Sequence, residues 1–522
     1  MRKQQKSLSL KNRITRFFLR SPSKYIFWIS LAMFFKALIP FLQLFLGHRA
    51  DSHLLSFGFI GDGPSYTDPI EHLVATGHYS PDFRMPGYGA IYYLFRCMMS
   101  YNAAYNCMII LQLILASLSV YFTALLARLV LKSKRAFFVC FYLFLISTYS
   151  NYYDICIMSE CACSAFLVFA TWFFALYLHK HKLKYMLFSG IFLAWVVFLR
   201  PVFLPVFGLF GFIYLIYAFK NKIGFIKPLL ILAIPFVIAD GAWITRNYSV
   251  HKKIMPLTNS ILYPYIDSSY MKNELQFVQS WGGAKEITDR TTAMSWFGGL
   301  LFPGEPELKN YDSVPDYVYT SAFNRDSLLR LKSKVHQFMA IQLPSLDSMF
   351  AKNNKDWNKV FPIFYYGLRP VSPQAAALQT DIENTFDKYT TSVKKEHKFL
   401  YYVKVPIILT KGFIYGDYMK VYFKRGNIGK LGPWIERFFN LFYLAMVFLG
   451  LAGAVLLLFK GFKSKSHQEW LLALIPIYTI LIHTCIIRMC AENRLFMPAW
   501  PFVLACAAYT IVAAKNLVKQ KG

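Results

Sequence analysis

The sequence is poor in charged residues, and among these it is poor in acids. Only 16% of its 522 residues are charged, whereas about 25% are charged in a typical soluble domain. It contains 27 Asp and Glu against 57 Lys and Arg, which gives a formal net charge of +30. Hydrophobic residues make up 56% of the chain, and the mean hydropathy is +0.37. This balance excludes an ordinary soluble protein and is typical of a chain that crosses a membrane many times.

Cysteine is present but follows no paired pattern. The nine Cys residues are spread singly, and none belongs to a CxxC or Cys/His set with zinc spacing. A secretory signal peptide is not expected, because about 23 polar and basic residues precede the first apolar run. A nucleic-acid partner is not expected either, since the basic residues form short clusters between apolar runs.

Apolar segments of the length that spans a bilayer, about 20 residues or somewhat fewer, recur along the chain. We predict ten of them, at residues 25–46, 104–127, 136–150, 158–178, 185–199, 202–219, 228–246, 436–459, 469–487 and 495–514. Only Arg200-Pro201 separates the fifth from the sixth. Proline lacks an N–H and disfavours helix in the residue before it, and a buried arginine is costly. We therefore expect the chain to turn there, with Arg200 at the outer surface.

Charge indicates which side of the membrane each loop occupies. The segments predicted to lie inside are 1–24, 128–135, 179–184, 219–227, 460–468 and 515–522. They hold 24 of the Lys and Arg residues and no Asp or Glu. By the positive-inside rule both termini are cytoplasmic and the long loops lie outside. The expected location is the inner (cytoplasmic) membrane, as a multi-pass protein.

The expected fold is an all-α polytopic membrane protein with about ten or more transmembrane helices and a smaller mixed soluble domain on the outer face. Residues 1–246 form an N-terminal membrane module that includes a first outer loop at 47–103. Residues 247–435 form an extracytoplasmic region, and residues 436–522 contain the last helices. Within 247–435, residues 397–424 are apolar but interrupted by charges, and we predict an interfacial or re-entering helix there.

The first outer loop begins with the stretch GDGPSYTDPIEHL, residues 61–73. Tyr66, Ile70 and Leu73 are spaced as one apolar face of a short helix. Asp62 stands near the start of this helix, where a carboxylate is a common N-cap worth about 1 kcal/mol. From spacing alone, a capping role and a functional role for Asp62 are equally open.

The second half of the loop reads PDFRMPGYGAIYYLF, residues 81–95. Arg84 precedes the turn Pro86-Gly87-Tyr88, and an apolar helix is expected to follow. The loop is thus predicted to contain two short helices, one with an acid at its start and the other with an arginine. Arg84 has two interpretations, a lipid headgroup contact or a contact to a substrate phosphate.

The order of these motifs resembles the first outer loop of class-C (GT-C) glycosyltransferases that use polyprenyl-phosphate sugars. The most similar patterns are those of bacterial protein O-mannosyltransferase-like enzymes and of the aminoarabinose transferases that modify lipid A. Further similar stretches are Met158-Ser159-Glu160, Arg200-Pro201, Arg246-Asn247 and Glu492-Asn493-Arg494. The resemblance covers residues 1–260 and 436–514 and is weak for 261–435.

The resemblance implies a membrane glycosyltransferase that moves a sugar from an undecaprenyl-phosphate-like donor to an envelope acceptor, with inversion and with Asp62 as base. A phosphate leaving group needs charge stabilisation rather than a proton, whereas the acceptor hydroxyl needs a base. One carboxylate suffices for this, while glycosidases need two because their leaving group is an alcohol.

Several further residues are candidates for the same site. Glu160 is a second catalytic candidate, and the candidates for substrate or donor-phosphate binding are Tyr66, Arg84, Tyr88, Arg200, Arg246 and Arg494. No cofactor is required. If a divalent metal binds, Asp154 and Glu160 are its expected ligands.

Each of these residues also has a structural interpretation. Glu160 and Asp154 could be polar span ends. The arginines at span ends could reach the headgroups or pair with a nearby acid. Asp240, inside a predicted span, is expected to form an internal ion pair with one of them.

The expected partners are the polyprenyl-phosphate-linked donor, a lipid, protein or glycan acceptor, and membrane lipids. Two alternative functions stay open. One is a transporter or flippase for lipid or glycan, although charges inside the predicted spans are few, with Lys36 and Asp240 the main examples. The other is a non-catalytic envelope-assembly protein with the same fold.

Overall fold

The structure is a computed structural model of the chain. It describes residues 21, 23–45, 55, 63–79, 84–252, 254–257, 271–282, 315–352, 370–415, 432–464, 467–488 and 493–521. The chain divides into two compact units. Unit 1 comprises residues 1–257, 417–478 and 496–522, and unit 2 comprises residues 258–416 and 479–495. All regular elements within the described ranges are helices.

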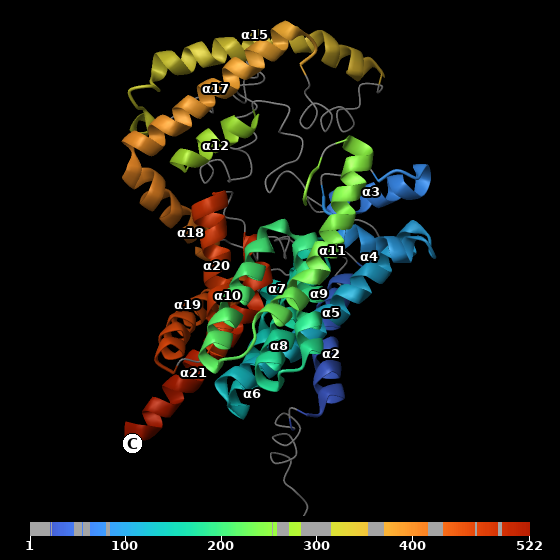
Figure 1. Cartoon of the computed structure of the whole chain (residues 1–522), viewed down its shortest axis with the longest axis vertical. Helices are drawn as coiled ribbons and strands as arrows, with labels where there is room; N and C mark the ends of the chain where they lie inside the picture. Colours follow the sequence, from blue (N-terminus) through green and yellow to red (C-terminus); the bar gives the residue numbers. More distant parts are fainter. Residues whose placement is uncertain are drawn as a thin grey trace, which may run out of the picture. The chain divides into compact units, whose positions relative to one another are not determined.

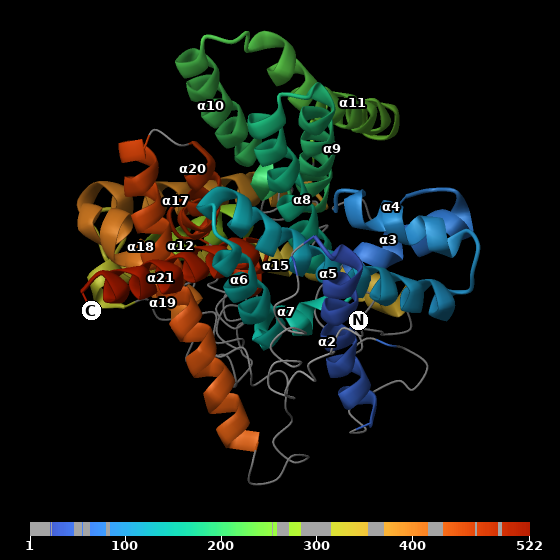
Figure 2. The ribbon, with the colours of Figure 1, turned by 90° about the horizontal axis from the view of Figure 1, so that it is seen from below.

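Unit 1 is a bundle of membrane helices with a helical hairpin at one end (Figures 1 and 2). Its early helices are α2 (Tyr25–Phe45), α3 (Gly63–Thr76), α4 (Gly87–Arg96), α5 (Tyr101–Leu131), α6 (Lys134–Ile146), α7 (Thr148–Asp154) and α8 (Ser159–Lys180). They are followed by α9 (Leu183–Leu199), α10 (Leu204–Asn221), α11 (Ile226–His251), α19 (Gly432–Ser464), α20 (His467–Leu481) and α21 (Trp500–Lys521). Helix α8 packs between α5 and α9, and α21 packs against α5, α6 and α19.

The predicted apolar segments are helical where the structure describes them, except that the segment predicted at 136–150 is broken at Ser147, between α6 and α7. In those ranges seven helices are long and apolar enough to cross a membrane: 101–131, 159–180, 201–221, 226–251, 432–463, 467–487 and 494–515. Two shorter apolar helices, 25–38 and 183–199, accompany them. Helix α6 has 13 residues, which is about 20 Å of rise and less than the hydrocarbon core of about 30 Å. The predicted turn at Arg200-Pro201 is confirmed, because α9 ends at Leu199 and a 3-10 turn begins at Pro201.

The last helix closes the bundle against the first ones. Gly450 and Gly453 on α19 face the backbone of Val503 and Cys506 so closely that neither position leaves room for a Cβ atom. Small residues of this kind let membrane helices approach each other. Near the start of α21, the Trp500 indole stacks on Tyr443 of α19 and donates to Ser147 Oγ (2.8 Å). Segments far apart in sequence therefore share one core.

Unit 2 has a core of its own. It contains α12 (Met271–Trp281), a 3-10 turn (Asp316–Val318), α15 (Arg325–Lys352), α17 (Pro373–Glu396), a π-helical turn (Leu400–Lys404) and α18 (Val405–Tyr415). Aromatic rings fill the space between α12 and α17, with Phe277, Phe323 and Tyr389 in mutual contact. A domain of mixed secondary structure is predicted here from the sequence, whereas the elements that the structure describes are all helices. The helix predicted within 397–424 is present from the π-turn to Tyr415, and its remainder lies outside the described residues.

An acid lies buried beside this aromatic core. Glu274 on α12 is fully buried, and within the described part of the chain neither of its carboxylate oxygens has a hydrogen-bond partner. Burial raises the pKa of Glu274 well above its ordinary value, since the charged form loses hydration without gaining a partner.

Glu274→Gln is expected to make the chain more stable at pH 8 and to flatten the dependence of its stability on pH. In the wild type the folded state keeps a proton that the unfolded chain loses above about pH 4.5. The unfolded state then binds fewer protons, so stability falls as pH rises through this window. The gain at pH 8 should be about 1.4 kcal/mol for each unit by which burial raises the pKa of Glu274, and it should vanish toward pH 4, where both side chains are neutral.

Thermal unfolding of the full chain in detergent, measured at pH 5 and pH 8, checks this expectation. Asp387→Asn on exposed α17 surface is the matched control and should change stability by less than about 0.5 kcal/mol. A Glu274→Gln variant that is less stable than the wild type at pH 8 would show that the carboxylate has a partner in the folded protein.

Candidate functional site

Helices α3 and α4, from the loop predicted to lie outside, form a clamped helical hairpin. The helix predicted from Tyr66, Ile70 and Leu73 is α3, and the helix predicted after Pro86 is α4. On α3, Glu71 accepts from Arg96 Nε (2.9 and 3.0 Å) and from the Tyr92 hydroxyl (2.7 Å) on α4. Burial and the bond to Glu71 raise the pKa of Tyr92, which keeps its hydroxyl a donor. The hairpin therefore has a fixed geometry of its own.

Tyr66 joins this hairpin to the start of α8. Its hydroxyl shares a hydrogen bond of 3.0 Å with Ser159 Oγ, the first residue of α8. The Arg84 guanidinium lies over the Tyr66 ring at 4.6 Å from the centroid, and Arg84 Nε donates to Ser65 Oγ (3.1 Å). Two of the predicted site residues, Tyr66 and Arg84, are thus in direct contact.

The second anchor of the hairpin is at the end of α9. A Cβ atom at Gly87 would lie 2.5 Å from the Phe198 carbonyl, so only glycine allows α4 to start here. The indole of Trp195 donates to Gly87 O (3.1 Å). The start of α4 therefore lies against Phe198, which precedes Arg200, the C-cap of α9, by two positions in the sequence.

Glu160 and Arg200 form a buried ion pair. Arg200 Nη1 lies 3.2 Å from Glu160 Oε1, and the Glu160 side chain is 2% exposed. Glu160 stands in the first turn of α8, where the helix dipole favours an acid. Its second oxygen, Oε2, is buried and has no hydrogen-bond partner among the residues that the structure describes. The carboxylate is therefore held by Arg200 through Oε1 alone within the described ranges.

Arg246 reaches the same hairpin from α11. Its Nη2 donates to the Tyr79 carbonyl (3.0 Å), and the Tyr79 hydroxyl in turn donates to the carbonyl of Arg84 (3.2 Å). Its guanidinium also lies over the Trp243 ring, 5.0 Å from the centroid. Arg84, Arg200 and Arg246 thus gather around one hairpin, although they come from three separate parts of the sequence.

The expectation that Asp240 pairs with an arginine is corrected by its geometry. Asp240 Oδ1 accepts the backbone N–H of Leu257 (2.9 Å) and so closes the chain segment that follows α11. The remaining predicted residues lie elsewhere. Arg494 belongs to unit 2 and is not placed relative to this hairpin. Asp62 lies outside the described residues, immediately before α3.

Tyr88 connects the hairpin to a polar network inside the bundle. Its hydroxyl donates to Gln112 Oε1 (2.6 Å) on α5. Gln112 Nε2 donates to the carbonyls of Asp154 (3.0 Å) and Cys156 (2.8 Å), which lead from α7 into α8. Sequence reasoning missed Gln112, although an amide within an apolar span is a signal of helix–helix bonding.

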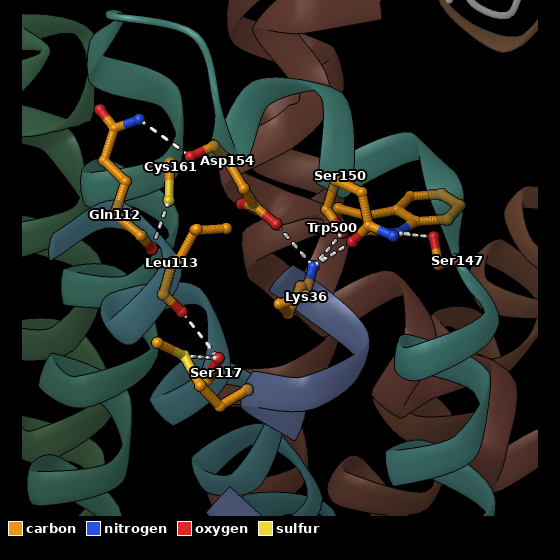
Figure 3. A network of polar contacts seen from close by, with 11 residues as sticks. Lys36, Gln112, Leu113, Ser117, Ser147, Ser150, Asp154, Cys161 and Trp500 are labelled. Carbon is orange, nitrogen blue, oxygen red and sulfur yellow. Dashed lines mark hydrogen bonds and ion pairs between the residues drawn. The ribbon is translucent and has the colours of Figure 1, made fainter. Parts of the chain in front are cut away.

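Lys36 belongs to the same polar network as Gln112, because both side chains bond to Asp154 (Figure 3). It is 2% exposed, and its Nζ lies 2.7 Å from Asp154 Oδ2 on α7. The same Nζ donates to Ser150 Oγ (2.9 Å) and Asn151 Oδ1 (2.6 Å). A lysine counted in the sequence only as a mid-span charge is thus the partner of the predicted metal ligand Asp154.

The expected metal ligands are already occupied by cations of the protein itself. Asp154 pairs with Lys36, and Glu160 pairs with Arg200. Among the described residues no three His, Cys, Asp or Glu side chains come together as a metal site. Asp154 and Glu160 do not fit a shared metal, and we derive no step through one.

These features define the class: a multi-pass, all-α membrane protein with an arginine-bearing loop hairpin docked on the ends of its spans. No protein-family profile matches the sequence, and no curated protein matches it. Solved structures of an oligosaccharyltransferase from Archaeoglobus fulgidus are similar in fold. Its apo form has a TM-score of 0.41 and 15% identity, covering 95% of this chain and 52% of that one.

Two further structures of that protein match this chain with similar TM-scores, identities and coverages. The form tethered to an acceptor peptide with the NVT sequon has a TM-score of 0.43 and 13% identity, covering 95% of this chain and 50% of that one. AglB with an inhibitory peptide and a dolichol-phosphate has a TM-score of 0.42 and 14% identity, covering 95% and 52%. The chain spans about half the length of these proteins.

Proposed function

We propose that the chain is a membrane glycosyltransferase that transfers a sugar from a polyprenyl-phosphate donor to an envelope acceptor. One observation carries the proposal: the hairpin is docked on the α8 start through Tyr66 and Ser159. This docking gathers Arg84, Arg200 and Glu160 at the ends of membrane helices. A lipid phosphate needs cations at the bilayer surface, and an acceptor hydroxyl needs a carboxylate nearby.

In the proposed mechanism the donor phosphate is held by guanidinium groups. Arg84 and Arg246 are both fixed on the hairpin, by Tyr66 and by Tyr79 respectively. Guanidinium groups bind phosphate oxygens in pairs and stabilise the charge that develops as the sugar–phosphate bond breaks. The leaving phosphate needs no proton, so no second acid is required on this side.

The acceptor hydroxyl is activated by Asp62 in this proposal. Asp62 precedes Gly63, whose Cβ position would lie 3.4 Å from the Ile157 carbonyl in the loop before α8. Glu160, buried against Arg200, would fix the Arg200 guanidinium beside the reacting groups. Attack from the face opposite the phosphate inverts the anomeric carbon. We propose the outer face of the inner membrane as the location, with both termini cytoplasmic.

Mass spectrometry of envelope lipids and glycans from cells with and without the protein tests the proposed function. We expect one envelope component to lose a single sugar residue in cells without the protein and to regain it on complementation. Unchanged glycan masses, together with a polyprenyl-phosphate sugar confined to one leaflet, would indicate the transporter instead. Unchanged masses and an unchanged lipid distribution would indicate an assembly protein without transfer activity.

A further inference from the structure

We infer that Lys36 is a positioning residue for the site. It is a buried cation that fixes the turn at residues 155–158 between α7 and α8, which we call the corner. This inference rests on the proposed function for its link to sugar transfer. The ammonium of Lys36 carries three N–H donors. Its Nζ contacts three oxygens on one short helix, those of Ser150, Asn151 and Asp154. Every donor of the ammonium therefore has an acceptor on α7.

The burial of the Lys36 ammonium and its partners indicates that these contacts fix the local geometry rather than add stability. Lys36, Asp154 and Asn151 are each at most 3% exposed. A buried ion pair is often no more stable than apolar side chains of the same volume, and a charge inside a membrane module is costly. Ionisable side chains inside membrane spans therefore often have a functional role. Here the cation belongs to α2, and its acceptors are all on the seven-residue α7.

The corner is held from a second side by Gln112. Its amide bonds the carbonyls of Asp154 and Cys156, and the Cys161 thiol donates back to the Gln112 carbonyl (3.4 Å). Figure 3 shows Lys36 and Gln112 on opposite sides of Asp154. Because Asp154 lies five residues before Ser159, these two clamps set where α8 begins. The start of α8 carries Ser159, which binds Tyr66, and Glu160.

The contacts of Lys36 also bear on whether a metal could bind at Asp154, which is a ligand only if a metal binds. A carboxylate, an amide oxygen and a hydroxyl oxygen are the ligands that hard cations such as Mg²⁺ and Ca²⁺ take. In this chain an ammonium lies among them, at 2.6–2.9 Å from each oxygen. Lys36 therefore supplies at this corner the positive charge that a metal would otherwise supply.

The test compares Lys36→Met, Lys36→Arg and the double variant Lys36→Met/Asp154→Leu with the wild type, using the full chain in nanodiscs. Hydrogen exchange of the backbone amides of residues 148–160 reports on the corner, and residues 205–221 of α10 serve as the internal reference. We expect at least about tenfold faster exchange at 148–160 in Lys36→Met, with partial recovery in Lys36→Arg. Unchanged exchange at 148–160 would overturn the inference.

The transfer rate and thermal unfolding separate positioning from simple charge balance. Lys36→Met should lower kcat at least about tenfold while KM for the polyprenyl-phosphate sugar changes by less than about twofold. The double variant removes the unpaired charge, so it should recover thermal stability but not kcat. Recovery of both would overturn the positioning role. A wild-type chain without transfer activity would refute the proposed function alone, and the exchange measurement would still decide whether Lys36 holds the corner.

Discussion

Asp62→Asn is expected to abolish sugar transfer while leaving the protein folded and able to bind its donor. Loss of a general base costs about 10²–10⁴-fold in rate. Asparagine is as good a helix N-cap as aspartate, so the substitution keeps a cap at the start of α3 and removes only the basicity. The measurement is turnover of a polyprenyl-phosphate sugar by purified variants, together with donor binding and thermal unfolding.

Asp68→Asn is the matched control for Asp62→Asn. Asp68 lies on the exposed side of the same helix, and its replacement should leave turnover within about twofold, as for surface changes away from a site. Near-normal turnover in Asp62→Asn would make Asp62 a cap only. A fall of the same size in both variants would indicate a general effect of charge on the hairpin.

The second large effect is expected when the buried pair between Glu160 and Arg200 is broken. Arg200→Met leaves the Glu160 carboxylate buried without its counter-ion, which costs about 3–5 kcal/mol of stability. Glu160→Gln keeps the side-chain shape but removes the charge that holds the Arg200 guanidinium, and turnover should fall at least about 100-fold if that cation stabilises the leaving phosphate. The double variant Glu160→Gln/Arg200→Met should be more stable than Arg200→Met, because it no longer buries the unpaired Glu160 carboxylate.

Arg96→Met provides the comparison for this pair. Its ion pair with Glu71 has the same chemistry, but the side chains are 23% and 28% exposed. Partly exposed pairs contribute about 0–1 kcal/mol, so Arg96→Met should be only slightly less stable than the wild type. Equal losses in Arg96→Met and Arg200→Met would mean that Glu160 is more hydrated than its burial indicates.

The helices and their breaks could be predicted from the sequence because these features are local. Apolar runs identify spans wherever they occur, and the missing N–H of Pro201 ends α9 regardless of its neighbours. The two loop helices follow from the spacing of Tyr66 and Ile70 and from the turn before Tyr88. Each prediction needed only residues within a few positions of one another.

Partners across the bundle could not be predicted in the same way. Lys36 and Asp154 are 118 positions apart, and Tyr88 and Gln112 belong to different helices. Which helices are neighbours depends on packing of the whole module, and the sequence of one span is compatible with several. The sequence therefore indicated Asp154 and Glu160 as candidates, with Glu160 catalytic and both as ligands if a metal binds, but it could not indicate their contacts to Lys36 and Arg200. The role of Asp62 stays a prediction.

The contact between Trp500 and Ser147 sets an order for biosynthesis. The two residues are 353 positions apart, and the Trp500 ring also packs on Tyr149 and Tyr443. The helices from Tyr25 to Leu199 are translated before α21, so the surface of α5 and α6 that packs on α21 stays uncovered until α21 has been inserted. Folding of the membrane module therefore cannot be completed before α21 is made, and a nascent chain that stalls before α21 leaves Ser147 and Tyr149 without their contacts to Trp500.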